Sequence, residues 1–264
     1  MPDDSVKKTL VVALAVCIVC SILVSTAAVS LHGIQKENKR LDKVKNILLA
    51  GDLFVEGGDI QSLYEENITP VMIELSSGET VPEEKFTKEL NITDFDIKKI
   101  AGDPAYSMMI PPDKDRAKIT KMPKFMVIYL VKKDNEIEKI VLSIYGKGLW
   151  STLYGFIALD RDLKTVKGFT FYEHAETPGL GGEIDNPRWK NSWKEKQAFD
   201  EEGNVKIKVI KGKVDTSRPE AIHQIDGISG ATLTARGVDD LVNFWLGNDG
   251  YGPFLNRFRE ELHG

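Results

Sequence analysis

The feature that most constrains this chain is an uncharged apolar run close to its N-terminus. Residues Thr9–Leu31 include no Asp, Glu, Lys or Arg. As an α-helix this run spans roughly 34 Å, enough to cross the ~30 Å hydrocarbon core of a bilayer. The preceding Lys7 and Lys8 also fit the basic start of a cleaved signal peptide, but the apolar run is longer than such peptides use. We therefore predict a transmembrane helix over 9–31, with a signal peptide as the alternative.

The charges around this run bear on which side of the membrane the rest of the chain occupies. Two lysines precede the run, and the basic residues that follow it closely are Lys36, Lys39, Arg40, Lys43 and Lys45. Taken literally, the positive-inside rule keeps the following residues in the cytoplasm. Large domains are translocated largely regardless of nearby charge, however, so local charge alone leaves the side open.

The rest of the chain is mildly acidic. Residues 32–264 carry the whole net charge of −5, because Asp3 and Asp4 cancel Lys7 and Lys8 before them. This balance argues against nucleic acid as a partner, since phosphate contacts require a basic surface. We divide the chain into a short tail over 1–8, the transmembrane helix over 9–31, a stalk helix over 32–50, and a soluble domain over 51–264 with an irregular excursion around 80–121.

Strand patterns follow one another at short intervals in the second half of the chain. Apolar runs separated by short polar turns, one of them Lys133–Glu136, predict a meandering antiparallel sheet. Helical spacing follows Asp59, and an amphipathic helix is predicted over Ala235–Leu246. The class is therefore α+β: a largely antiparallel twisted sheet with flanking helices, preceded by one N-terminal transmembrane helix. The predicted strands are Phe125–Val131, Ile140–Tyr145, Leu153–Leu159, Val166–Tyr172 and Val205–Ile210.

Residue types that build common catalytic and metal sites are scarce. Both cysteines, Cys17 and Cys20, lie in the apolar run, where we interpret them as small packing residues. His174 and Glu176 have the H-x-E spacing of zinc deaminases, but no cysteine pair completes such a site. The chain also lacks a nicotinamide fingerprint and a G-x-S-x-G elbow. We expect no catalytic residue and no metal ligand in this chain.

Two segments rich in small residues suggest a binding site. Glu173–Glu183 (EHAETPGLGGE) follows a predicted strand, and its glycines allow the backbone to approach a flat or phosphorylated group. A plain glycine turn with solvated acids is the alternative. Asp226–Thr234 (DGISGATLT) precedes the predicted helix, where unpaired N–H groups favour an anion. An N-cap formed by Thr232 or Thr234 is the alternative there, but a cap does not need the Gly230–Ala231 pair, so the segment suits a phosphate.

Aromatic residues are frequent in the same part of the chain. They are Trp150, Tyr154, Tyr172, Trp189 and Trp193. Most are expected in the core or at an interface, and one or two supply a face on which a planar ring stacks.

Both segments resemble the signatures of the FMN-binding domain family. Asp226–Thr232 (DGISGAT) is similar to the motif in which a flavin transferase esterifies FMN phosphate onto the last threonine, and His174–Gly181 (HAETPGLG) to the second signature. Within this family, Gly148–Gly155 (GLWSTLYG) and the single N-terminal helix resemble the C subunits of the Na⁺-translocating NADH:quinone reductases. The similarity runs over roughly 8–258 and is weakest in 80–121. The G subunits of the Rnf-type ferredoxin:NAD oxidoreductases share both signatures.

The resemblance implies a role for each matching residue. It implies that Thr232 carries FMN through a phosphoester, with Trp150 and Leu180 on either side of the isoalloxazine ring and Thr177 and Gly179 at its polar edge. The other residues expected to recognise the transferase or line the cofactor are Asp226, Ser229, Gly230, Ala231, Leu233, Thr234 and Gly181.

The resemblance also implies a function that the chain does not perform alone. It implies an electron-transfer subunit, carrying covalent FMN, of a complex that couples NADH oxidation and quinone reduction to Na⁺ export. The implied partners are the other subunits, a flavin transferase and membrane lipid, in the bacterial inner membrane with the soluble domain on the periplasmic side. The alternatives are the Rnf-type G subunit and a membrane-anchored flavin-binding sensor or assembly protein.

Overall fold

The chain consists of two units, Met1–Lys43 and Val44–Gly264. The computed structural model describes residues 6–134 and 136–263. Helix α1 (Val6–Ala50) supplies the described part of the first unit, and its 44–50 end belongs to the second. Among the described residues it is the helix long and apolar enough to cross a membrane. Residues 1–5 of the predicted tail and Asn135 of the predicted turn lie outside the described residues.

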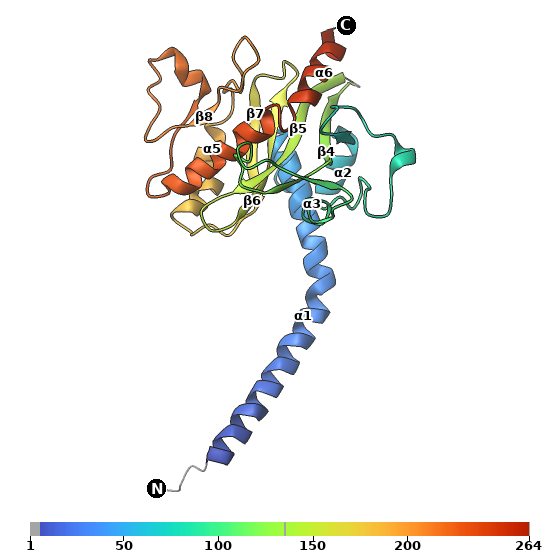
Figure 1. Cartoon of the computed structure of the whole chain (residues 1–264), viewed down its shortest axis with the longest axis vertical. Coiled ribbons are helices and arrows are strands. Elements are labelled where there is room, and N and C mark those ends of the chain that lie inside the picture. Colours follow the sequence, from blue (N-terminus) through green and yellow to red (C-terminus); the bar gives the residue numbers. More distant parts are fainter. Residues whose placement is uncertain (1–5, 135, 264) are drawn as a thin grey trace. The chain divides into compact units, whose positions relative to one another are not determined.

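A five-stranded antiparallel sheet forms the centre of the second unit (Figure 1). Its strand order is β1-β4-β5-β6-β7, so β4 to β7 form a meander and β1 pairs with β4 at one edge. The central strands read as nearly continuous apolar runs because both of their faces are buried. The bounds are β1 Ile68–Glu74, β4 Phe125–Lys133, β5 Glu136–Lys147, β6 Thr152–Asp160 and β7 Val166–Glu173.

The remaining elements are short or lie on the sheet. Two small sheets pair β2 (Ser107–Met109) with β3 (Lys121–Pro123) and β8 (Lys208–Val209) with β9 (Gln224–Ile225). The other helices are α2 Ile60–Asn67, α3 Ile97–Gly102, α4 Pro187–Asn191, α5 Thr232–Leu246 and α6 Gly252–His263, with 3₁₀ turns η1 Glu83–Lys85, η2 Gly181–Asp185 and η3 Pro219–His223.

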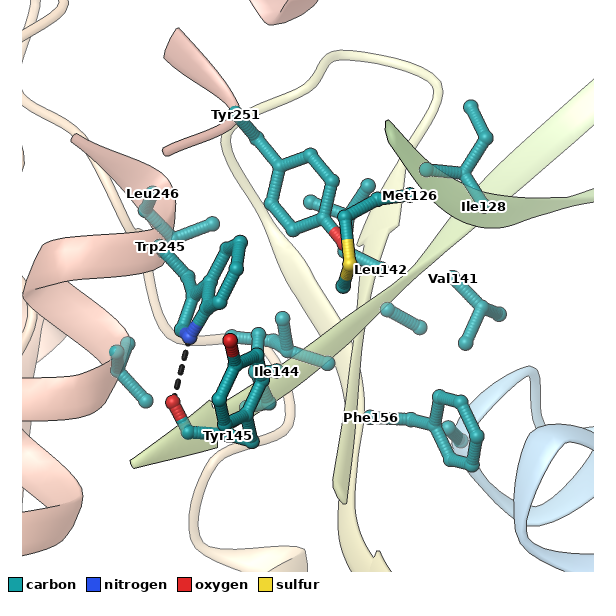
Figure 2. Close-up of a cluster of buried hydrophobic side chains, with 14 of the residues drawn as sticks. Met126, Ile128, Val141, Leu142, Ile144, Tyr145, Phe156, Trp245, Leu246 and Tyr251 are labelled. Atoms are coloured by element: carbon teal, nitrogen blue, oxygen red, sulfur yellow. Dashed lines mark hydrogen bonds between the residues drawn. The ribbon is translucent and has the colours of Figure 1, made fainter. Parts of the chain in front are cut away.

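Helix α5 packs directly on β5. A Cβ on Gly146 would lie only 2.5 Å from the Leu241 Cβ, so the missing side chain lets helix and strand approach. Figure 2 shows the indole of Trp245 in the core beside this strand, where its Nε1–H donates to the Tyr145 carbonyl at 2.6 Å. Trp245 is fully buried, so this bond satisfies its one polar group. These contacts fix the position of α5, and with it the position of its first residue, Thr232.

The end of α1 is part of the same core. Ile47 and Leu48 are buried, and the Thr170 hydroxyl of β7 donates to Asn46 Oδ1 at 2.8 Å. A Cβ on Gly168 would collide with the Ala50 carbonyl oxygen. Residues 44–50 therefore pack into the core of the domain that we predicted to begin at residue 51. The predicted division into domains stays a prediction.

The structure confirms the predicted α+β class and corrects several elements. Four of the five predicted strands lie in the sheet, but Val205–Ile210 does not: Lys208–Val209 pairs in parallel with β9, and Val205 forms an isolated bridge with Phe199. The edge strand β1 and the C-terminal helix α6 were not predicted. Helix α2 begins after Asp59 as predicted, with the Asp59 carboxylate accepting from its first N–H groups.

Candidate functional site

Three segments meet at one end of the sheet. Because β5, β6 and β7 are antiparallel neighbours, the 148–151 turn between β5 and β6 and the segment after Glu173 leave the sheet at the same end. The first turns of α5 pack there too, since a Cβ on Gly237 would collide with the Lys147 carbonyl oxygen. The fold thus brings together the Trp150 turn and both of the predicted segments.

The Glu176 carboxylate joins these three segments. Its side chain is buried, and Oε1 accepts from the backbone N–H groups of Trp150 (3.0 Å) and Ser151 (3.1 Å) and from the Ser151 hydroxyl (3.1 Å). Oε2 accepts from the Thr234 hydroxyl at 2.6 Å and from the Leu149 N–H at 3.3 Å. One side chain from the segment after β7 therefore holds both the β5–β6 turn and the start of α5.

The surroundings of Glu176 favour its charged form. Burial raises the pKa of this carboxyl, but the hydrogen bonds from Thr234 and from the Trp150 and Ser151 N–H groups outweigh burial, so the pKa lies below its ordinary value. No role of Glu176 was predicted from the sequence. The available sequence signal was the two glycines that leave space for this carboxylate. A Cβ on Gly148 would lie 2.7 Å from Oε1, and a Cβ on Gly181 would lie 2.8 Å from Oε2.

The start of α5 differs from the sequence-based predictions of its first residue and of its N-cap. The helix begins at Thr232, before the predicted Ala235, and no side chain among the described residues caps it at Ala231. The alternative of an N-cap by Thr232 or Thr234 is therefore wrong. The Thr234 hydroxyl is buried and donates to Glu176, whereas Thr232 is exposed at the positive end of the helix. Of the two threonines, only Thr232 is exposed.

Large apolar side chains are exposed on the three segments that meet at this end of the sheet. Trp150 is 68% exposed and Leu180 47% exposed, and Leu233, next to Thr232, is 55% exposed. Leu180 reaches the Thr232 segment, because a Cβ on Gly230 would lie 3.1 Å from its Cδ2 atom. Gly230 also has φ +75°, a conformation that favours glycine. Exposed apolar surface of this kind indicates a place where another molecule binds.

Two predicted residues of the second signature lie at the rim of this surface. Thr177 is exposed, and its carbonyl oxygen accepts from the N–H groups of Leu180 (3.1 Å) and Gly182 (2.9 Å). Gly179 has φ +74°, and a Cβ on it would meet no atom within 4 Å. Gly181, by contrast, is buried, and a Cβ there would lie 2.6 Å from the Thr234 hydroxyl oxygen. Gly181 therefore makes room inside the site, while Thr177 and Gly179 face outward.

Asp226 is turned toward neighbouring loops. Its Oδ1 accepts from the Val214 N–H at 2.7 Å, and its carbonyl oxygen accepts from Trp189 Nε1 at 2.8 Å. Trp189 and Trp193 are buried, so these tryptophans belong to the core. An open depression separates the two signatures; its lining includes Gly179, Asn186, Arg188, Asp226 and Ser229. Ala231, the N-cap residue, is buried.

His174 supports the segment after β7. Its Nε2 lies 2.6 Å from Asp185 Oδ2, and its Nδ1 accepts from the Glu176 N–H at 3.2 Å. The hydrogen bond to Asp185 raises the pKa of His174, against the opposing effect of burial. No group of three potential metal-ligating side chains occurs among the described residues. The arrangement therefore offers an exposed hydroxyl, a helix N-terminus and apolar side chains.

Comparisons with known proteins agree with this geometry. The FMN-binding domain family matches residues 148–247, which include all three segments of the site. The C subunit of the Na⁺-translocating NADH-quinone reductase of Pseudomonas aeruginosa is 44% identical over 261 residues, 98% of each chain. The C subunit of the Yersinia pestis reductase is 43% identical, over 98% of this chain and 95% of that one.

Solved structures extend the likeness to the fold. The crystal structure of Shewanella oneidensis NqrC is 34% identical with a TM-score of 0.76, over 84% of this chain and 99% of that chain. The crystal structure of the C subunit from Parabacteroides distasonis is 29% identical with a TM-score of 0.64, over 85% and 96%. With identity above 40% to curated relatives over almost the entire length, the chain belongs to the family of Na⁺-translocating NADH-quinone reductase C subunits, and it contains an FMN-binding domain.

Proposed function

We propose that this chain is the subunit of a Na⁺-translocating NADH:quinone oxidoreductase that carries FMN, covalently attached through its phosphate to Thr232, and passes electrons through it toward quinone. The observation that carries this proposal is the exposed Thr232 at the start of α5, which no described side chain caps, on a helix that Glu176 joins to the turn of exposed Trp150. The names of the relatives favour this complex over the Rnf-type alternative.

The residues present fit FMN. A phosphate esterified to the Thr232 hydroxyl lies at the helix N-terminus, where the first-turn N–H groups and the helix dipole stabilise negative charge. Thr234, by contrast, has its hydroxyl buried against Glu176 and is not available for attachment. Trp150 and Leu180 supply apolar faces for the flat ring, and Gly179 leaves open space beside it.

When bound, FMN supplies the oxidation–reduction chemistry, and the protein supplies position and electrostatics. Trp150 and Leu180 orient the ring and exclude water from its faces. The helix N-terminus compensates the phosphate charge. The exposed position of the site allows a partner protein of the complex to approach, as electron exchange between subunits requires. We further propose that α1 anchors the chain in the bacterial inner membrane, in contact with lipid, with the domain on the periplasmic side, where a flavin transferase attaches FMN.

The proposed role is tested in the assembled complex. Thr232→Ala removes the attachment hydroxyl and is expected to lower NADH-dependent quinone reduction by an order of magnitude or more, while the amount of assembled complex stays the same. Thr234→Ser is the matched control, because it keeps the hydroxyl that donates to Glu176, and it is expected to retain activity. A Thr232→Ala complex with wild-type quinone reduction contradicts the proposal.

A further inference from the structure

We propose that Glu176 is a positioning residue for the flavin: its carboxylate fixes the Trp150 turn against the start of α5, and its negative charge lowers the reduction potential of the cofactor held there. This inference rests on the proposed function, since it concerns the group attached at Thr232. It assigns a role to a buried acid that is neither one of the exposed apolar residues nor the attachment residue.

The contacts of Glu176 define its protonation state. All five hydrogen bonds to its oxygens come from uncharged donors: three backbone N–H groups and the hydroxyls of Ser151 and Thr234. A carboxylate accepts from all five donors, whereas a protonated carboxyl would have to donate to one of the two hydroxyl oxygens and so reverse that hydrogen bond. The donors stabilise the anion without cancelling its charge, so its field extends to its surroundings.

The same contacts place the charge beside the cofactor residues. Oε1 lies 3.0 Å from the Trp150 backbone nitrogen. Oε2 lies near Gly181, where a Cβ would approach it to 2.8 Å, and Gly181 directly follows Leu180. The Thr234 hydroxyl, 2.6 Å from Oε2, comes two residues after Thr232. The carboxylate therefore lies between the backbone segments that carry both proposed ring contacts and the attachment residue.

Two consequences follow for the attached flavin. Because one side chain fixes three segments, Trp150, Leu180 and Thr232 keep their relative positions. Because reduction adds negative charge to the flavin, a fixed anion in a partly dry site opposes it. The carboxylate thus makes the flavin a weaker electron acceptor than the same site without the charge.

Glu176→Gln separates charge from structure. The amide keeps Oε1 as the acceptor for the Trp150–Ser151 turn, and its NH₂ group donates to the Thr234 hydroxyl oxygen, so the hydrogen bond lost is the long one from the Leu149 N–H. Thr234→Val does the reverse, because it keeps the charge and removes one hydrogen bond. Asp240→Asn is the charge control. It removes a carboxylate of α5 that is paired with Arg116 and lies roughly 12 Å along the helix axis from Thr232.

The readouts are the mass and the midpoint potential of the full-length purified protein, measured by redox titration of the flavin absorbance. Glu176→Gln is expected to retain the FMN mass and to raise the midpoint potential by about 59 mV for a one-electron step, a tenfold change in the equilibrium. Thr234→Val and Asp240→Asn are expected to keep the wild-type potential. Thr234→Val is also expected to unfold at a lower temperature, because Glu176 loses a donor.

The inference is overturned if flavinylated Glu176→Gln has the wild-type potential, or if Asp240→Asn shifts the potential equally. If Glu176→Gln does not fold, Glu176→Ala decides, because it removes the charge and leaves space for water to accept the freed hydrogen bonds: a raised potential supports the role of the charge, and a wild-type potential overturns it. Absence of FMN from the wild-type protein contradicts the proposed function instead, so the two failures are distinguishable.

Discussion

At the scale of single residues, two glycines leave the space that a buried carboxylate occupies in this site. The carboxylate of Glu176 occupies the volume that side chains at Gly148 and Gly181 would fill. Thr234 and Thr232, two residues apart, have opposite surroundings: the first is buried against Glu176 and the second is exposed. A difference of two positions on α5 thus separates a buried, hydrogen-bonded hydroxyl from an exposed threonine.

Gly181→Ala is expected to destabilise the domain. The added Cβ would lie 2.6 Å from the Thr234 hydroxyl oxygen and 2.8 Å from Glu176 Oε2, so it forces apart the hydrogen bond between them. Overpacking of this kind costs about 1–3 kcal/mol of unfolding free energy. Urea denaturation measures the loss. Gly102→Ala, where a Cβ meets nothing within 4 Å, is the control and is expected to change stability by less than about 0.5 kcal/mol. Equal effects of both substitutions contradict this account of Gly181.

Among the secondary-structure elements, those with strong local patterns were predictable. The apolar runs of β4 to β7 and the turns between them indicated a meander, and the structure confirms the α+β class. Strand β1 (Ile68–Glu74) was missed because it contains Pro70 and directly follows a helix. The apolar alternation in Val205–Ile210 was misleading, because the Val209 N–H pairs with Asp239 of α5 and not with the sheet.

Contacts between distant residues were not predictable from local patterns. The Glu176 site joins residues 25 to 58 positions apart in the chain. The acid looked like one of several in a polar loop, and only the fold places it beneath the Trp150 turn. The residues of the flavin motif, by contrast, were recognisable from their sequence before any contact was known.

The hydrogen bond between His174, after β7, and Asp185, in η2, predicts a pH-dependent contribution to stability. Because this bond raises the pKa of His174, its contribution is complete below the ordinary histidine value near pH ~6.5 and is lost as the pH rises through the raised pKa. Asp185→Asn is therefore expected to lower the urea midpoint more at about pH 5.5 than at about pH 9.

Asp249→Asn is the control for this comparison. Asp249 pairs with Lys114, which stays charged at both pH values because the pair raises its already high pKa. Its effect on the midpoint is expected to be the same at both pH values. An Asp185→Asn effect that does not change between them contradicts the assigned role of His174.

At the scale of the whole molecule, we propose a membrane anchor followed by a flavin domain on the periplasmic side. Helix α1 has the length and composition to span a bilayer. We expect the mature protein to keep its apolar run over 9–31, to resist carbonate extraction from membranes, and to be cleaved by protease added outside spheroplasts. A chain that begins after residue 31 supports the signal-peptide alternative, and protection from external protease contradicts the periplasmic assignment.

The central claim is that Thr232 carries FMN, and the mass of the purified protein tests it most directly. When the chain is produced with a flavin transferase, its mass is expected to exceed that of the polypeptide by about 438 Da, which is FMN minus water. The tryptic peptide Val214–Arg236 is expected to hold this added mass, and fragmentation is expected to assign it to Thr232. Thr232→Ala should lack the mass and Thr234→Ser should retain it. An unmodified wild-type chain from such a host, or an added mass that persists in Thr232→Ala, contradicts the account.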